Sequence, residues 1–213
     1  MRSDRFSNLK RHNRHRPLRR RIVIVTEGTK TEISYFNAIK PLCRDDLYLD
    51  VSSPDHSSPK HILQKLKSIY REAANTSHLE LWAVVDYDNW QSEDIQTLAK
   101  WLADQKKGNK CANAGLLLSC PKFEFWLLLH FEDGLAIQSA ESVDSRLQKY
   151  LPQYKKEFPP SLITPQSVQQ AILRCEKICS VRWPETATFP PSDVLGASRV
   201  HILLKEILKN VQN

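Results

Sequence analysis

Hydrophobic and polar positions alternate along the chain in blocks that predict a parallel α/β fold. The run IVIVT at 22–26 is continuous and β-branched, as expected for a strand buried on both faces. A segment with apolar residues near helical spacing follows at 30–42. Three more strand-and-helix pairs are predicted, with strands at 47–52, 79–86 and 114–119 and helices at 58–75, 92–107 and 121–131. Four such units in series predict a mostly parallel sheet of about four strands, flanked by helices and joined by right-handed crossovers.

The pattern changes after Gly134. Helical segments there are separated by proline-rich breaks, and an amphipathic helix is expected at 198–210. A chain of 213 residues fits one enlarged domain. We therefore expect a core at 21–133 and a helical extension at 134–213 that packs on it.

The positive charge is concentrated at the amino end. The first 21 residues hold nine lysines and arginines and one acid, whereas the whole chain carries only +7, so the remainder is close to neutral. Residues 1–20 are predicted to form a basic, flexible arm. Such an arm either is a solvated tail or contacts nucleic-acid phosphates, with Arg19, Arg20 and Arg21 as candidate contacts.

The chain carries no apolar leader and no run long enough to cross a membrane, which predicts a cytoplasmic protein. Its five cysteines are odd in number and contain no CxxC pair, which argues against a disulfide scaffold and a zinc ribbon. Cys175 and Cys179 lie four residues apart on an expected helix. They are candidates for a metal site, although small buried thiols are the commoner interpretation.

Acidic residues follow two of the predicted strands. Glu27 comes directly after the first strand, and Asp86 and Asp88 end the third. Ligands of open parallel sheets bind at the carboxyl ends of the strands. If these two strands are neighbours, the three carboxylates converge into an oxygen-only site suited to Mg²⁺ or Mn²⁺. A DxD sequence alone is more often a turn, but the second acid at the matching edge favours the metal site.

The segment after Glu27 has a single glycine, which excludes a Walker loop and a dinucleotide fingerprint. Thr29 and Glu32 have the spacing of a capping box, so Glu32 is interpreted as structural. Lys30 stands near the start of the same helix and is a candidate phosphate contact.

A second candidate stretch is PKFEFWLLLHFED at 121–133. Its helix is apolar almost all round, which predicts burial. Glu124 in its first turn is a candidate metal ligand or general base, with an ion pair as the alternative. His130 is interpreted as a core histidine, and Lys122 as a candidate phosphate contact.

Several motifs together resemble the RloB-like proteins, also called the AbiLii family, of bacterial phage-defence operons. They are IVIVTEGTKTEISYF, VVDYD, CPKFEFWLLLHFED, YKK at 154–156 and SRVHILLKEIL, and they span roughly residues 20–210. The resemblance implies a Toprim-like catalytic core, with a Glu after the first strand and a DxD after the third. These positions correspond to Glu27, Asp86 and Asp88. It also implies an ABC- or OLD-type ATPase partner encoded nearby.

Our hypothesis from the sequence is a Mg²⁺-dependent Toprim-type nuclease acting on DNA or RNA in abortive infection. Glu27, Glu124 and Lys30 are its candidate catalytic residues. Two alternatives remain: a catalytically silent nucleic-acid-binding or regulatory subunit of the ATPase, and nucleotidyl transfer as in primases. Whether the chain forms a homodimer is left open.

Overall fold

The protein is built on one five-stranded sheet. The computed structural model describes residues 19–87 and 93–209. The strand order is β2-β1-β3-β4-β5, in which the first four strands are parallel and β5 runs antiparallel to β4. The strands are β1 (Arg20–Thr26), β2 (Leu47–Ser52), β3 (Leu79–Asp86), β4 (Asn113–Cys120) and β5 (Ala197–Ser198). The predicted α/β class and parallel sheet are confirmed.

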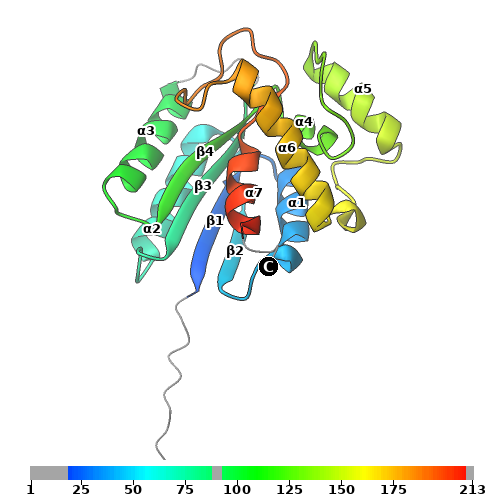
Figure 1. Ribbon diagram of the computed structural model, residues 1–213. Coiled ribbons are helices and arrows are strands. Elements are labelled where there is room, and N and C mark those ends of the chain that lie inside the picture. Colours follow the sequence, from blue (N-terminus) through cyan, green and yellow to red (C-terminus); the bar gives the residue numbers. More distant parts are fainter. Residues whose placement is uncertain (1–18, 88–92, 210–213) are drawn as a thin grey trace, which may run out of the picture.

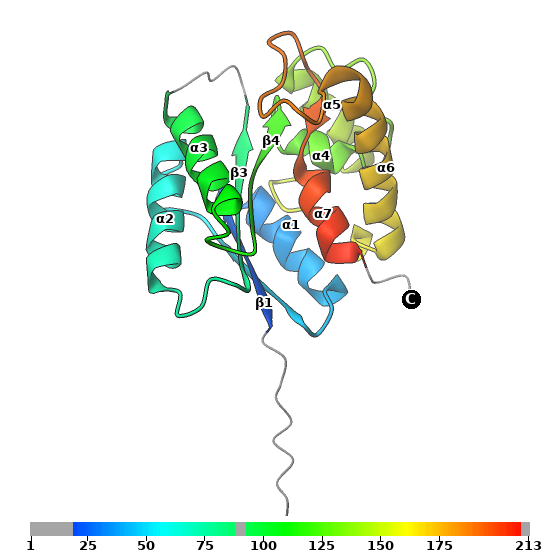
Figure 2. The ribbon, with the colours of Figure 1, turned by 60° about the vertical axis from the view of Figure 1, so that its left-hand side comes forward.

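Helices cover both faces of the sheet. They are α1 (Thr31–Ile39), α2 (Pro59–Glu72), α3 (Glu93–Lys107), α4 (Glu124–Leu128), α5 (Ala140–Tyr150), α6 (Pro165–Arg182) and α7 (Val200–Leu208), with short 3-10 turns at Lys40–Leu42 and Pro160–Leu162. Helices α2 and α3 lie on one side of the sheet, whereas α1, α4, α6 and α7 lie on the other (Figures 1 and 2). The molecule therefore has three layers, and the central strands are enclosed between them.

Local sequence explains most of these elements. Strand β1 is buried from Ile22 to Thr26, as its unbroken apolar run predicted. The side chain of Ser58 caps α2 by accepting a hydrogen bond from the amide of His61, and Pro59 occupies the first turn. The predicted helix at 121–131 is shorter than expected, because α4 begins only at Glu124.

The extension after Gly134 contributes to the sheet itself. Its two-residue strand β5 pairs Ser198 with Ser119 and Ala197 with Cys120 of β4. Helix α7 follows immediately and packs beside α6, as both views show (Figures 1 and 2). A two-residue strand has no detectable hydrophobic period, so the sequence did not indicate this fifth strand.

The amino edge of the sheet is held by ion pairs. Arg20 bonds the carboxylate of Glu80, which is only 1% exposed and also accepts a hydrogen bond from the indole of Trp82 at 3.1 Å. Arg21 pairs with Asp50 of the neighbouring strand β2. These contacts lie at the opposite end of β1 from Glu27.

Within residues 19–87 and 93–209, no helix combines the length and the apolar character that a membrane span requires.

Val25 tests how much of the stability rests on the central strand. Its side chain is fully buried, whereas Val181 at the end of α6 is 83% exposed. Val25→Ala is expected to lower the free energy of unfolding by about 2–3 kcal/mol, because it removes buried methyl groups and leaves a cavity. The matched change Val181→Ala should stay within about 0.5 kcal/mol of the parent. Urea unfolding measures both, and equal losses would contradict the assigned burial of β1.

Candidate functional site

The strand order creates a crevice at the carboxyl edge of the sheet. Strands β1 and β3 are parallel neighbours, with Thr26 in register with Val84. The chain leaves β1 for α1 on one face, but it leaves β3 for α3 on the other (Figure 2). Adjacent strands whose connections diverge in this way form the usual ligand crevice of an open α/β sheet.

Glu27 and Asp86 meet at this crevice. The amide of Glu27 extends the ladder by donating to the carbonyl of Val84 at 2.9 Å. The carboxylate of Glu27 in turn accepts a hydrogen bond from the amide of Asp86 through Oε2, at 3.2 Å. The first and third strands are therefore neighbours, which is the condition on which the predicted convergence of the acids depended, and Glu27 joins their two ends.

Asp86 sits among other acids. Its Oδ1 accepts a hydrogen bond from the amide of Phe123 at 2.8 Å, just before α4. Burial raises the pKa of the Asp86 carboxyl well above its usual range, and the negative charges of Glu32, Glu124 and Glu27 raise it further. A carboxylate in such surroundings favours a nearby cation.

Glu32 belongs to the same site, and its capping-box interpretation is wrong. Helix α1 has Lys30 as its N-cap residue, and no side chain there accepts a capping hydrogen bond. The Glu32 side chain instead turns back over the loop, where its Oε1 accepts from the amide of Gly28 at 3.1 Å. A Cβ at Gly28 would come within 2.1 Å of the Glu32 carboxylate, so the close approach requires glycine. Burial raises the pKa of Glu32.

The Glu124 side chain is 4% exposed and forms an ion pair, which was the alternative to its predicted role as metal ligand or general base. Its Oε1 accepts from Lys156 Nζ at 2.7 Å and from the hydroxyl of Tyr154 at 3.4 Å. The Tyr154 hydroxyl also lies 3.2 Å from Thr31 Oγ1 at the start of α1. Partial burial lowers the pKa of Lys156, but the hydrogen bond to Glu124 and the charge of Glu124 raise it, and the net effect is a raised pKa. The YKK motif of the extension thus reaches the acids of the core.

Glu32, Asp86, Glu124 and Lys156 line one small cavity of about 250 Å³. Its wall consists of Gly28, Thr29, Lys30, Thr31, Glu32, Asp86, Glu124 and Lys156. Among them only lysines bring positive charge, and Lys30 is exposed at the rim. Hard divalent cations such as Mg²⁺ prefer carboxylate oxygens, so this donor set fits the metal predicted from the sequence.

Four other predicted site residues, Lys122, Arg19, Arg20 and Arg21, do not line this cavity. Lys122 pairs with Asp144 of α5 at 2.7 Å. Arg20 and Arg21 are held by carboxylates at the amino edge, and Arg19 precedes them, so nucleic-acid contact there stays a prediction. Asp88 lies outside the described residues, as do residues 1–18 of the arm.

Sequence reasoning missed Glu32, Tyr154 and Lys156 as site residues. Glu32 was assigned to a helix cap because its spacing from Thr29 allowed it. Tyr154 and Lys156 stand more than 120 residues from Gly28 along the chain. The only signal for them was the YKK motif itself, which is too short to be informative alone.

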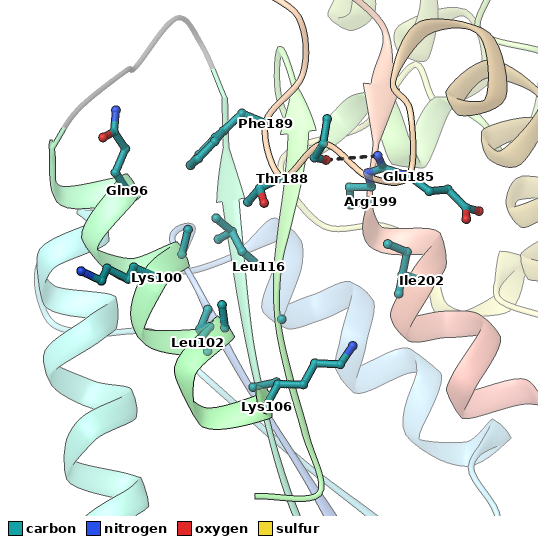
Figure 3. A pocket seen from close by; sticks show the side chains of 15 residues that line it. Gln96, Lys100, Leu102, Lys106, Leu116, Glu185, Thr188, Phe189, Arg199 and Ile202 are labelled. Carbon is teal, nitrogen blue, oxygen red and sulfur yellow. Dashed lines mark hydrogen bonds between the residues drawn. The ribbon is translucent and has the colours of Figure 1, made fainter. Parts of the chain in front are cut away.

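A larger cavity of about 460 Å³ lies away from the acids. It opens between α3 and α7 over β4, with Lys100, Lys106 and Leu116 among its lining residues (Figure 3). Arg199 also borders it, but its guanidinium stacks on Trp183 and donates to the Trp183 and Pro184 carbonyls. Among the described residues, none of the acids at the carboxyl edge lines this cavity.

A comparison of the chain with models of known protein families gives the same family as the sequence motifs. A family model described as RloB-like protein matches residues 22–207, so the chain belongs to the RloB-like family. No curated protein and no solved structure matches it.

Because the pKa of Asp86 is raised, the variant Asp86→Asn is expected to gain stability to unfolding, and the size of the gain should depend on pH. Because the folded-state pKa lies above the unfolded value, the stability from this group is complete below the unfolded pKa and is lost as pH rises through the folded pKa. Asparagine keeps an acceptor for the Phe123 amide and does not ionise. In metal-free buffer the variant should therefore be more stable than the parent at about pH 8, and the gain should vanish near pH 4.

Urea unfolding across that pH range measures the difference. Asp193→Asn, which changes an exposed acid in the loop before β5, is the matched control and should show no such trend. If Asp86→Asn gains the same stability at about pH 4 as at about pH 8, the environment assigned to Asp86 is contradicted.

Proposed function

We propose that this RloB-like protein is a Mg²⁺-dependent phosphodiesterase of the Toprim type that hydrolyses DNA or RNA. The observation that carries the proposal is the convergence of Glu27, Glu32, Asp86 and Glu124 where β1 and β3 end. Such a concentration of buried and half-buried carboxylates is unfavourable without a cation. It also agrees with the Toprim pattern that the sequence motifs imply, in which a Glu follows the first strand and an Asp the third.

Asp86 and Glu32 are the proposed principal ligands, because both line the cavity and burial raises the pKa of each. Bound Mg²⁺ would supply positive charge for the phosphate oxygens and lower the pKa of water. Glu27 completes the ligand set or accepts the proton of the attacking water. Its orientation is set by the hydrogen bond from the Asp86 amide.

Hydrolysis consumes one water for each phosphodiester bond. The water oxygen bonds to phosphorus, the bond from phosphorus to the leaving sugar oxygen breaks, and that oxygen takes a proton. Lys156 is placed to stabilise phosphate charge, because it lines the cavity and is 58% exposed despite its bond to Glu124. Lys30 at the rim has the same proposed role.

The biological setting is proposed from the family resemblance. We infer a role as effector in phage defence or abortive infection, together with an ABC- or OLD-type ATPase. The activity tests therefore include that ATPase as a separate arm.

Glu27→Gln and Asp86→Asn test the activity directly. Each is expected to lower Mg²⁺- or Mn²⁺-dependent cleavage of DNA and tRNA by at least about 100-fold, because each removes a charge at the reacting phosphate. Gel analysis of labelled substrates, with and without the ATPase, measures cleavage. Circular dichroism checks that the variants fold.

Asp193→Asn is the control and should cleave like the parent. If no metal-dependent cleavage occurs in either arm while nucleic acid is still bound, the silent-subunit alternative is favoured. Nucleotide-dependent growth of products would indicate primase-like transfer instead.

Glu32→Gln distinguishes a metal ligand from a structural loop residue. Glutamine keeps an oxygen that accepts from the Gly28 amide, so the loop should be preserved while the charge is lost. We expect affinity for Mn²⁺, followed by electron paramagnetic resonance, to fall about 10-fold or more. Glu141→Gln, at an exposed acid of α5, should bind Mn²⁺ like the parent. Unchanged affinity in Glu32→Gln would assign that side chain to the loop alone.

A further inference from the structure

A sulfur and nitrogen cluster lies where α6 meets the start of α7. Cys175 and Cys179 stand one turn apart on α6, and His201 is in the first turn of α7. All three side chains are buried, at 0%, 3% and 6% exposed. Their ligand atoms lie within 4.8 Å of one another.

The carbonyl oxygen of Ser198 is the fourth polar atom of the cluster. It lies 3.0 Å from Cys175 Sγ, 3.4 Å from Cys179 Sγ and 2.9 Å from His201 Nδ1. Cys175 Sγ is also 3.2 Å from His201 Nδ1. Three groups thus compete for one carbonyl oxygen that has two lone pairs. At most two of the three groups bond this oxygen at one time.

The spacing of four atoms is close to that of the donors in a tetrahedral metal site. They are the two Sγ atoms, His201 Nδ1 and the Ser198 carbonyl oxygen. Donors about 2.0–2.3 Å from a central ion, in a tetrahedron, are separated by about 3.3–3.8 Å. Four of the six separations, from 2.9 to 3.4 Å, need to open by only a few tenths of an ångström, and the other two, from Cys179 Sγ to Cys175 Sγ and to the His201 ligand nitrogen, are at most 4.8 Å. We propose that Cys175, Cys179 and His201, with the Ser198 carbonyl, bind one zinc ion.

The donor chemistry selects the ion. Thiolates favour zinc over Mg²⁺, whereas the carboxylates at the carboxyl edge have the opposite preference. Two thiolates balance the charge of Zn²⁺, so the buried site is neutral overall. Burial lowers the pKa of His201 to about 4, which leaves the imidazole neutral and ready to bind at neutral pH. Zinc binding releases the remaining thiol protons to solvent.

The position gives the site a structural role. Ser198 belongs to β5, and its hydroxyl lies 3.0 Å from that of Ser119 in β4. Ser119 is in register with Asp86 across the sheet. A zinc ion would therefore tie α6 and α7 to the edge strand β5, which pairs with β4 next to the acid-bearing end of β3.

Zinc content and cobalt spectroscopy test the proposal with the full chain. Protein purified without chelator from zinc-supplemented cells should contain one zinc per chain. The cobalt-loaded protein should show thiolate-to-cobalt charge transfer and intense tetrahedral bands. Free zinc at about 100 times Kd should raise Tm by roughly 5–10 °C.

Cys179→Ser is the sharpest variant. Serine still donates a hydrogen bond to the Ser198 carbonyl, but it is a poor zinc ligand, so a purely hydrogen-bonded cluster would tolerate it. We expect its zinc affinity to fall by more than the ~10–100-fold typical of removing an outer-shell partner. The variant His201→Gln should lose zinc affinity in the same way. The control is Cys111→Ser, because the Cys111 thiol is also buried and donates to the Asn113 carbonyl at 3.2 Å.

The parent protein alone decides the outcome if a variant fails to fold. A parent that takes up no zinc and shows no thiolate-to-cobalt band overturns the proposal. So does zinc uptake that is equal in the parent, Cys179→Ser and Cys111→Ser. Because neither readout depends on nucleic-acid cleavage, failure here leaves the proposed phosphodiesterase activity untouched.

Discussion

The pairing of β1 with β3 is the constraint on which the candidate site depends. Their parallel register pairs Thr26 with Val84, so Glu27 and Asp86 follow at the same end of the two strands, and the amide of Asp86 bonds the carboxylate of Glu27. Since the two connections leave toward opposite faces, the space between them is open. The other two acids are placed relative to that junction. The turn into α1 positions Glu32, and the turn after β4 positions Glu124.

Like charges at this junction require compensation, which the backbone provides in large part. Amides of Gly28, Asp86 and Phe123 donate to the carboxylates of Glu32, Glu27 and Asp86 respectively. Lys156 supplies a positive charge to Glu124 from the extension. The raised pKa of Asp86 indicates that this compensation is incomplete. A site that is held together, yet still short of positive charge, is well suited to attract a cation.

The extension after Gly134 thus does more than cover the core. It delivers Tyr154 and Lys156 to the acids, and it returns as β5 and α7 to extend the sheet. At that return Cys175, Cys179 and His201 gather on one carbonyl. The two donor sets differ in chemistry, one of oxygen and one mainly of sulfur and nitrogen, and they lie on either side of β4.

The sequence by itself determined the four parallel strands, most helices and the positions of the acids at strand ends. Continuous β-branched runs, the Ser58–Pro59 helix start and the placement of Glu27 and Asp86 are local features, so they can be read from neighbouring residues. Only the tertiary structure decided which strands are adjacent and which distant side chains meet. Glu32 joined the site because α1 starts one residue later than its capping pattern suggested. Lys156 and His201 reached their partners through chain reversals that leave no periodic signal, since contacts between remote segments depend on the packing of the whole chain.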